Sequence, residues 1–126
     1  MAKLTHRELF SFANFKAGTH RKVGHNRAVV HMDYENEEHI VGTLYGHPVF
    51  ILAKHKSPGW GAYRDLILDH CGHRSVTTRQ AMGDFMRAAG IPGGASFAKG
   101  SFTARINGCD HKEAANGRIA AQLVDA

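Results

Sequence analysis

The sequence predicts an α+β fold, with a small antiparallel sheet of about five or six strands, one central capped helix and short terminal helices. Two patterns lead to this prediction. Short apolar runs bounded by Gly, Pro, Asn and Asp recur along the chain, which is typical of strands joined in hairpins. One later segment instead repeats its apolar residues at helical spacing. Of the 126 residues, 43% are hydrophobic and 21% are charged, so we expect a single domain spanning residues 1–126.

The N-terminal part is expected to hold a short helix followed by a basic arm. The segment His6–Phe15 places Leu9 beside three phenylalanines in an apolar cluster, which favours a short helix over the core. Residues 16–27 are rich in Gly, Asn, His and basic side chains and have no periodicity. They predict a loop or an extended arm.

Strands are predicted in the middle of the chain, where apolar residues alternate or run together. They cover residues 28–32, 39–45, 47–55 and 64–70. An acidic connection at residues 33–38 follows the first strand, and Gly46 joins the next two into a hairpin. A loop at residues 56–63 precedes the last strand, because its Pro and Gly residues break regular structure.

The best-defined element is a helix that begins near Thr77. Thr77 is the expected N-cap, and Gln80 lies three residues later, as in a capping box. Gly90 is expected to end the helix in the left-handed conformation. Between them, apolar residues recur at the spacing of one helix face. These residues are Met82, Phe85, Met86 and Ala89.

Two further elements are predicted toward the C-terminus. The pattern of residues 95–108 predicts a hairpin that turns at Lys99 and Gly100. A final short helix is expected after Asp110, which would act as its cap. The residues that this helix would bury are Ala115, Ile119 and Leu123.

The charge pattern favours binding to nucleic acid. The net charge is +5, and an acidic block at residues 33–38 leaves the rest of the chain basic. Lys and Arg side chains neutralise phosphates, and an exposed aromatic side chain can stack on an unpaired base. The candidate nucleic-acid-binding residues are Arg21, Lys22, Arg27, Lys54, Lys56, Arg74, Arg79 and Trp60. DNA or RNA is therefore the expected partner, and an ordinary solvated basic face is the alternative explanation.

A protein partner is the competing interpretation. The chain would then be a non-enzymatic inhibitor or assembly protein that binds another protein. Its contact surface would be the acidic stretch 33–39, or an exposed strand edge that pairs with a partner or with a second copy of the chain.

A zinc site is a further candidate. Residues 71–73 and 109–111 both have the pattern Cys-x-His. Two such pairs would supply the four nitrogen and sulfur ligands that structural zinc prefers. The candidate ligands are Cys71, His73, Cys109 and His111. The alternative is a small buried thiol beside a turn, so no cofactor is expected apart from this zinc candidate.

No catalytic residue is predicted. The chain lacks a Walker-type phosphate loop and the paired His-x-Glu and Cys-x-x-Cys motifs of zinc deaminases. Ten histidines make some chance contact between a His and an Asp or Cys nearly unavoidable. A histidine-dependent nuclease that uses His70 and His73 is the enzymatic alternative.

No segment predicts a membrane span. The longest apolar run, Pro48–Ala53, is far shorter than the roughly 18 residues that a span requires. The N-terminal stretch is interrupted by polar residues from Thr5 to Glu8, so it lacks the apolar region of a signal peptide. We therefore expect a cytoplasmic protein without a membrane partner.

Several short motifs lie between Thr43 and Asn107. They are formed by Gly46, His47, Cys71, Gly72, Thr77, Thr78, Lys99, Gly100 and Phe102. This order resembles a diffuse group of small, mostly bacteriophage-encoded proteins of unknown function, with a Leu-x-Gly-His strand, a Cys-Gly turn and a late Lys-Gly-aromatic hairpin. His73 departs from the group's usual Trp, and Arg74 and Ser75 replace the usual residue before Thr. The resemblance implies a phage accessory protein, so the protein partner of the competing interpretation would be a host or phage protein. It assigns no activity.

Overall fold

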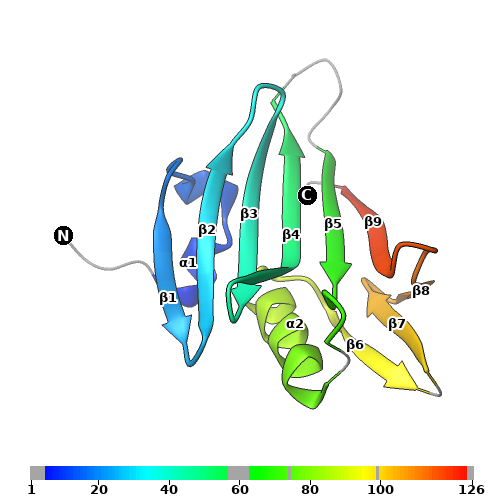
Figure 1. The fold of residues 1–126 in the computed structure, drawn as a ribbon. Helices are drawn as coiled ribbons and strands as arrows, with labels where there is room; N and C mark the ends of the chain where they lie inside the picture. The colour runs from blue at the N-terminus through cyan, green and yellow to red at the C-terminus, as the bar shows by residue number, and fades with distance from the viewer. Residues whose placement is uncertain (1–4, 57–62, 74, 99, 125–126) are drawn as a thin grey trace.

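The larger sheet is antiparallel throughout, and its strands lie in the order β1-β2-β3-β4-β5-β9 (Figure 1). The computed structural model describes residues 5–56, 63–73, 75–98 and 100–124. The strands of this sheet are β1 (His20–Gly24), β2 (Arg27–Asp33), β3 (Glu37–Leu44), β4 (His47–His55), β5 (Tyr63–Asp69) and β9 (Arg118–Val124).

A smaller antiparallel sheet lies beside it, in the order β6-β7-β8. Its strands are β6 (Gly93–Ala98), β7 (Ser101–Ile106) and β8 (Cys109–Lys112). The helical elements are α1 (His6–Leu9), the 3-10 turn η1 (Phe12–Asn14) and α2 (Val76–Ala88). The predicted α+β fold with an antiparallel sheet and one central capped helix is therefore confirmed, although the second sheet was not expected.

Helix α2 begins and ends as its sequence dictates, with one change at the start. The N-cap is Ser75 rather than Thr77, because the Ser75 Oγ accepts a hydrogen bond of 3.2 Å from the Thr78 amide. At the other end, the Ile91 amide donates to the Met86 carbonyl at 2.9 Å. Gly90 between them has a φ of +76°, so the predicted left-handed helix end is confirmed.

The core lies between α2 and one face of the larger sheet. The ring centroid of Phe85 on α2 lies 5.9 Å from that of Phe50 on β4 and 5.5 Å from that of Phe10 after α1. Gly42 on β3 faces the same ring, and a Cβ there would lie 2.7 Å from a Phe85 ring carbon. The close approach of α2 to the sheet therefore requires glycine at position 42. Phe102 on β7 joins the same apolar cluster.

The prediction of a basic arm at residues 16–27 is wrong in part. Residues His20–Gly24 form β1, which pairs with β2 at the edge of the larger sheet. An edge strand that is exposed along most of its length needs no alternating apolar residues, so its sequence resembles that of a loop. The predicted helix His6–Phe15 is shorter, because α1 ends at Leu9 and only η1 follows. Its aromatic and Asn residues are weak helix formers.

The predicted C-terminal helix is wrong. Arg118–Val124 form β9, in which Ile119, Ala121 and Leu123 are buried and the residues between them are exposed. This alternation is the signature of a strand, and Gly117 before it has a φ of +78°. The predicted hairpin at residues 95–108 is confirmed as β6 and β7, although Lys99 lies outside the described residues.

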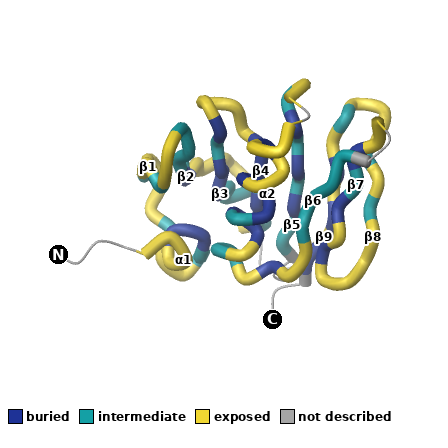
Figure 2. The backbone as a smooth tube through the Cα atoms, turned by 90° about the horizontal axis from the view of Figure 1, so that it is seen from below, coloured by how far each residue is buried: buried dark blue, intermediate teal, exposed yellow. Residues whose placement is uncertain are grey.

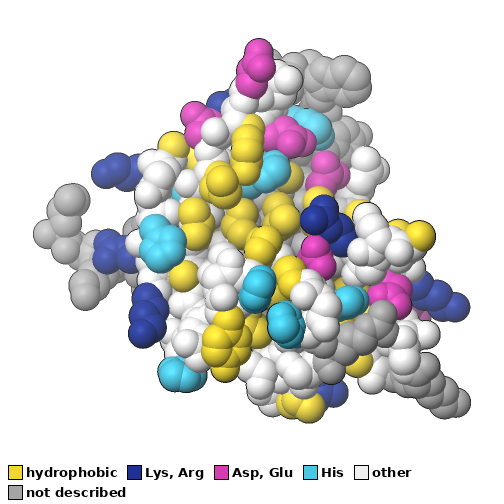
Figure 3. Space-filling view, in the orientation of Figure 1, with side chains coloured by type: hydrophobic (Ala, Val, Ile, Leu, Met, Phe, Trp, Pro, Cys, Tyr) yellow, Lys and Arg dark blue, Asp and Glu magenta, His cyan; other side chains and the backbone are white. Residues whose placement is uncertain are grey.

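The face of the larger sheet opposite α1 and α2 carries no helix among the described residues (Figure 2). Val41 on β3 and Ala53 on β4 are buried on this open face, yet neither belongs to the core cluster. They are surrounded by half-buried apolar side chains of neighbouring strands, Val30, Ile51 and Ile67. Figure 3 shows hydrophobic side chains in the middle of the open face and acidic ones toward its top.

Candidate functional site

The two ends of the larger sheet carry different side chains. The tyrosine end comprises the β1–β2 turn, the β3–β4 turn and the start of α2, which lie together at the bottom of Figure 1. The carboxylate end comprises the β2–β3 connection, the end of β4 and the start of β5, at the top of the same view. Candidate sites occur at both ends.

Several of the predicted nucleic-acid-binding residues already have partners within the chain. The Arg27 Nη1 lies 2.5 Å from the Asp84 Oδ2 and so ties β2 to α2. Lys56 pairs with Asp33 at the carboxylate end. The Lys54 Nζ lies 5.8 Å from the centroid of the Phe12 ring, on the helical side of the sheet. These three side chains do not form one basic surface.

The remaining predicted residues divide between the two faces. Arg21 pairs with Val29, a core residue, so Arg21 lies on the helical side of β1. Lys22 pairs with Ala28 and therefore lies on the open face. Arg79 is exposed on α2. Arg74 and Trp60 lie outside the described residues, so the structure does not place them.

A first hollow lies at the tyrosine end between the β1–β2 and β3–β4 turns. A hydrogen bond of 2.7 Å from the Tyr45 amide to the Asn26 carbonyl holds the two turns together. The hollow has a volume of about 330 Å³, and its polar lining includes His20, Lys22 and Arg27. It thus places cationic groups beside Tyr45.

A second hollow lies between the β3–β4 turn and the start of α2. Its volume is about 270 Å³, and Leu44 and Val49 form an apolar part of its lining. Polar side chains from three segments complete it: Tyr45, His47, His70, His73, Ser75, Thr77 and Thr78. The ring centroids of the exposed His47 and His73 lie 5.2 Å apart. The first turn of α2 adds the positive end of a helix dipole to this hollow.

Tyr45 lines both hollows and stands out in two respects. Its exposed fraction is 64%, the highest of any large hydrophobic side chain in the part of the chain that the structure describes. Its φ is +52°, and Gly46 after it has a φ of +80°. A tight hairpin turn needs these angles, but Asn, Asp and Gly adopt them far more readily than Tyr. Strained residues of this kind are concentrated at functional sites.

His70 differs from the other two histidines of the second hollow, because its ring is part of the fold. Its Nδ1 accepts a hydrogen bond of 3.0 Å from the Gly72 amide, so the proton of the neutral ring lies on Nε2. The Nε2 lies 3.4 Å from the Glu113 Oε2, a contact whose geometry falls short of a hydrogen bond. The ring also packs edge-on against Phe102. With both nitrogens oriented in this way, His70 does not offer the free base that the nuclease alternative requires.

The predicted zinc ligands are not gathered into a site. Cys71 follows β5 and is half-buried, whereas Cys109 begins β8 and is exposed. Burial, with a smaller contribution from the Asp69 carboxylate, raises the pKa of the Cys71 thiol. A zinc ligand is a thiolate, so this environment does not favour one. Within the described residues, no three of the four predicted ligands bring their donor atoms within 4.8 Å of one another.

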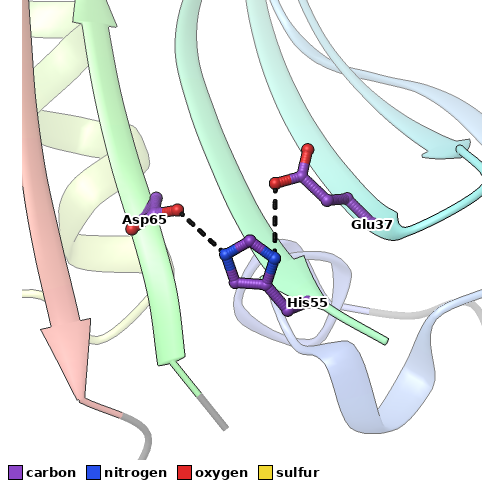
Figure 4. A group of neighbouring side chains, drawn as sticks. All are labelled: Glu37, His55 and Asp65. Atoms are coloured by element: carbon purple, nitrogen blue, oxygen red, sulfur yellow. Dashed lines mark ion pairs between the residues drawn. The ribbon is translucent and has the colours of Figure 1, made fainter. Parts of the chain in front are cut away.

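A different group at the carboxylate end does meet that distance. One donor atom each from Glu37, His55 and Asp65 lies within 4.8 Å of the others (Figure 4). The His55 Nδ1 lies 3.6 Å from the Glu37 Oε1, and its Nε2 lies 3.5 Å from the Asp65 Oδ2. No local sequence pattern indicates this group, because its members come from three different strands.

Comparisons with known proteins leave the resemblance to phage proteins a prediction. No family model matches the chain, and neither a search of curated proteins nor a search of solved structures found a match. Among the described residues, no helix has the length and apolar character needed to cross a membrane.

Proposed function

We propose that the protein binds single-stranded nucleic acid at the tyrosine end, with Tyr45 stacking on an unpaired base. The observation that carries this proposal is an exposed tyrosine, held in a strained turn, between two hollows lined by cationic, histidine and hydroxyl groups. Stacking on an aromatic side chain contributes about 1–3 kcal/mol per base and depends little on sequence. The binding is therefore of low sequence specificity.

Phosphates on either side of the stacked base have a suitable environment. In the first hollow, Lys22 lies on the open face beside His20. In the second, the hydroxyls of Ser75 and Thr77 lie at the start of α2, where the helix dipole favours an anion. These contacts are electrostatic, so affinity falls as salt concentration rises.

A single strand fits this surface better than a duplex. Stacking requires the face of an unpaired base, and each hollow, of about 270 to 330 Å³, has a volume suited to one base or one phosphate group. Arg27, a candidate for phosphate contact, is already paired with Asp84. The cationic side chains at this end are therefore few, so we expect weak binding that is tightest at low salt.

The test is fluorescence anisotropy with a short labelled oligo-dT and the corresponding oligo-U. Replacement of Tyr45 by Ala is expected to weaken binding about 10-fold, because the stacked base loses its platform. Tyr34→Ala is the matched control, since Tyr34 has an exposed fraction of 44% but lies at the carboxylate end. Equal affinities of the Tyr45→Ala variant and the parent protein would refute the proposal.

The same experiment addresses the competing interpretation. A cytoplasmic phage-type inhibitor or assembly protein would show no salt-sensitive retention of oligonucleotide. It would instead form a complex with a purified host or phage protein that survives high salt.

A further inference from the structure

The group at the carboxylate end arises from strand register. Glu37 on β3 is the direct cross-strand partner of His55 on β4. Asp65 on β5 pairs with Ala53, two residues before His55, so its side chain lies on the same face. In Figure 4 the imidazole ring lies between the two carboxylates, with one nitrogen toward each.

Within the part of the chain that the structure describes, no Lys or Arg forms an ion pair with Glu37 or Asp65. Within the described residues, the cationic partners of Glu37 are His39 and His55, and that of Asp65 is His55. When the imidazole rings are neutral, two carboxylates therefore face one another across a ring without a counter-charge. Like charges at such separations repel, and a cation between them relieves the repulsion.

The donor set and its spacing suit a transition metal. We propose that Glu37, His55 and Asp65 bind one divalent transition-metal ion of the Zn²⁺ or Co²⁺ type. In a tetrahedron with metal–ligand distances of about 2.1 Å, neighbouring ligand atoms lie about 3.4 Å apart. The separations of 3.6 Å from Nδ1 to Glu37 and 3.5 Å from Nε2 to Asp65 are close to this value, but they involve different nitrogens of His55. An ion on one nitrogen therefore has one carboxylate in place, and the other, with its donor atom within 4.8 Å, reaches the ion by side-chain rotation.

Neighbouring side chains support this arrangement. The His39 Nε2 lies 3.1 Å from the Glu37 Oε2 and leaves the Oε1 facing His55. The ring of Tyr34 packs against that of His39 with centroids 4.5 Å apart. Contacts of this kind orient a ligating carboxylate. The side chains of the three ligands keep exposed fractions of 31 to 40%, so water can occupy the remaining coordination positions.

The ligand chemistry also sets the selectivity. An imidazole nitrogen is a good ligand for Zn²⁺, Co²⁺ and Ni²⁺, whereas Ca²⁺ and Mg²⁺ prefer oxygen ligands alone. The group is thus expected to bind Co²⁺ in the presence of a large excess of Mg²⁺.

The test is a Co²⁺ titration of chelator-treated protein, followed by visible absorption and by native mass spectrometry. The expected result is one Co²⁺ per chain, with the absorption bands of a protein-bound ion. His55→Gln and Asp65→Asn are each expected to weaken Co²⁺ binding at least 10-fold. His47→Gln is the matched control, because His47 is an exposed histidine at the tyrosine end, and it should bind Co²⁺ as the parent protein does.

Two outcomes would overturn the site: no stoichiometric ion at millimolar Co²⁺, or equal binding by the His55→Gln variant. Circular dichroism of each variant separates loss of a ligand from loss of the fold, and Glu37→Gln serves as a third ligand variant if one of the others unfolds. The Tyr45→Ala variant is expected to bind Co²⁺ normally. The metal site and the proposed nucleic-acid site can therefore fail independently of each other.

Discussion

The two ends of the larger sheet differ in how their polar side chains are arranged, because those of one end come mainly from strands and those of the other from turns and a helix start. At the carboxylate end, strand register places His55 within 3.6 Å of both Glu37 and Asp65. Lys56 pairs with Asp33 at the same end. At the tyrosine end, the side chains come from turns and a helix start and border two hollows.

This difference suggests different partners for the two ends. Three side chains with donor atoms within 4.8 Å of one another suit the small metal ion that we propose. Exposed groups spread around an aromatic ring instead suit a larger ligand with several charges and a flat surface. The same sheet thus offers a compact site at one end and an extended one at the other.

The largest expected effect is on stability, and it comes from disturbing the packing of α2 against the sheet that carries both ends. Gly42→Ala would place a Cβ 2.7 Å from the Phe85 ring, so we expect a loss of about 1–3 kcal/mol in the free energy of unfolding. Urea denaturation measures it. Gly83→Ala on α2 is the control: the nearest atom to its new Cβ would lie 3.7 Å away, and the change should not destabilise the protein. Unchanged stability of the Gly42→Ala variant would contradict the close contact between α2 and the sheet.

A smaller effect would show whether the proposed nucleic-acid binding uses the open face of the tyrosine end. Lys22 and Arg21 are neighbours on β1, but only Lys22 lies on the open face. Lys22→Glu should weaken oligonucleotide binding about 10-fold and reduce the slope of log affinity against log salt by about one. Arg21→Glu changes the net charge equally and should weaken binding less. Equal losses in the two variants would indicate a general charge effect rather than a local site.

The smallest expected effect concerns the two thiols. Burial raises the pKa of the Cys71 thiol, so at pH 8 a smaller fraction of Cys71 is thiolate than at an exposed cysteine. Cys109 is exposed and should therefore react several-fold faster with iodoacetamide, as measured by peptide mass spectrometry. Because its pKa is raised, the rate at Cys71 should continue to rise with pH above the pH at which an ordinary exposed thiol is fully ionised. Equal rates at all pH values would contradict the burial of Cys71.

Helix α2 was predictable because every local pattern agreed on it. Its apolar spacing, the Ser and Thr residues at its start and Gly90 at its end all indicate one helix, and only the capping residue shifted. The C-terminal segment was ambiguous, since Ile119 and Leu123 are four residues apart and fit both a helix face and a strand face. The segment forms a strand because it pairs with β5, and this pairing cannot be predicted from the local sequence.

The sites were less predictable than the fold because they depend on contacts between distant segments. The hairpin at Gly46 was predicted, but the contact of its turn with Asn26 was not, and that contact places Tyr45 beside a basic hollow. The two Cys-x-His pairs repeat a local pattern, yet the structure gathers Glu37, His55 and Asp65 instead. Strand register, which joins these three, is fixed by the whole sheet.

The hydrogen bond between the Tyr45 amide and the Asn26 carbonyl has a consequence for the energetics of recognition. It fixes the backbone of one turn against another, so the aromatic ring is presented from a frame that is ordered before any ligand arrives. Binding at the proposed nucleic-acid site would then cost little conformational entropy in the protein, because only side-chain rotation remains to be restricted. A preorganised platform of this kind can be altered by exchanging the side chain at position 45 while the rest of the protein keeps its shape.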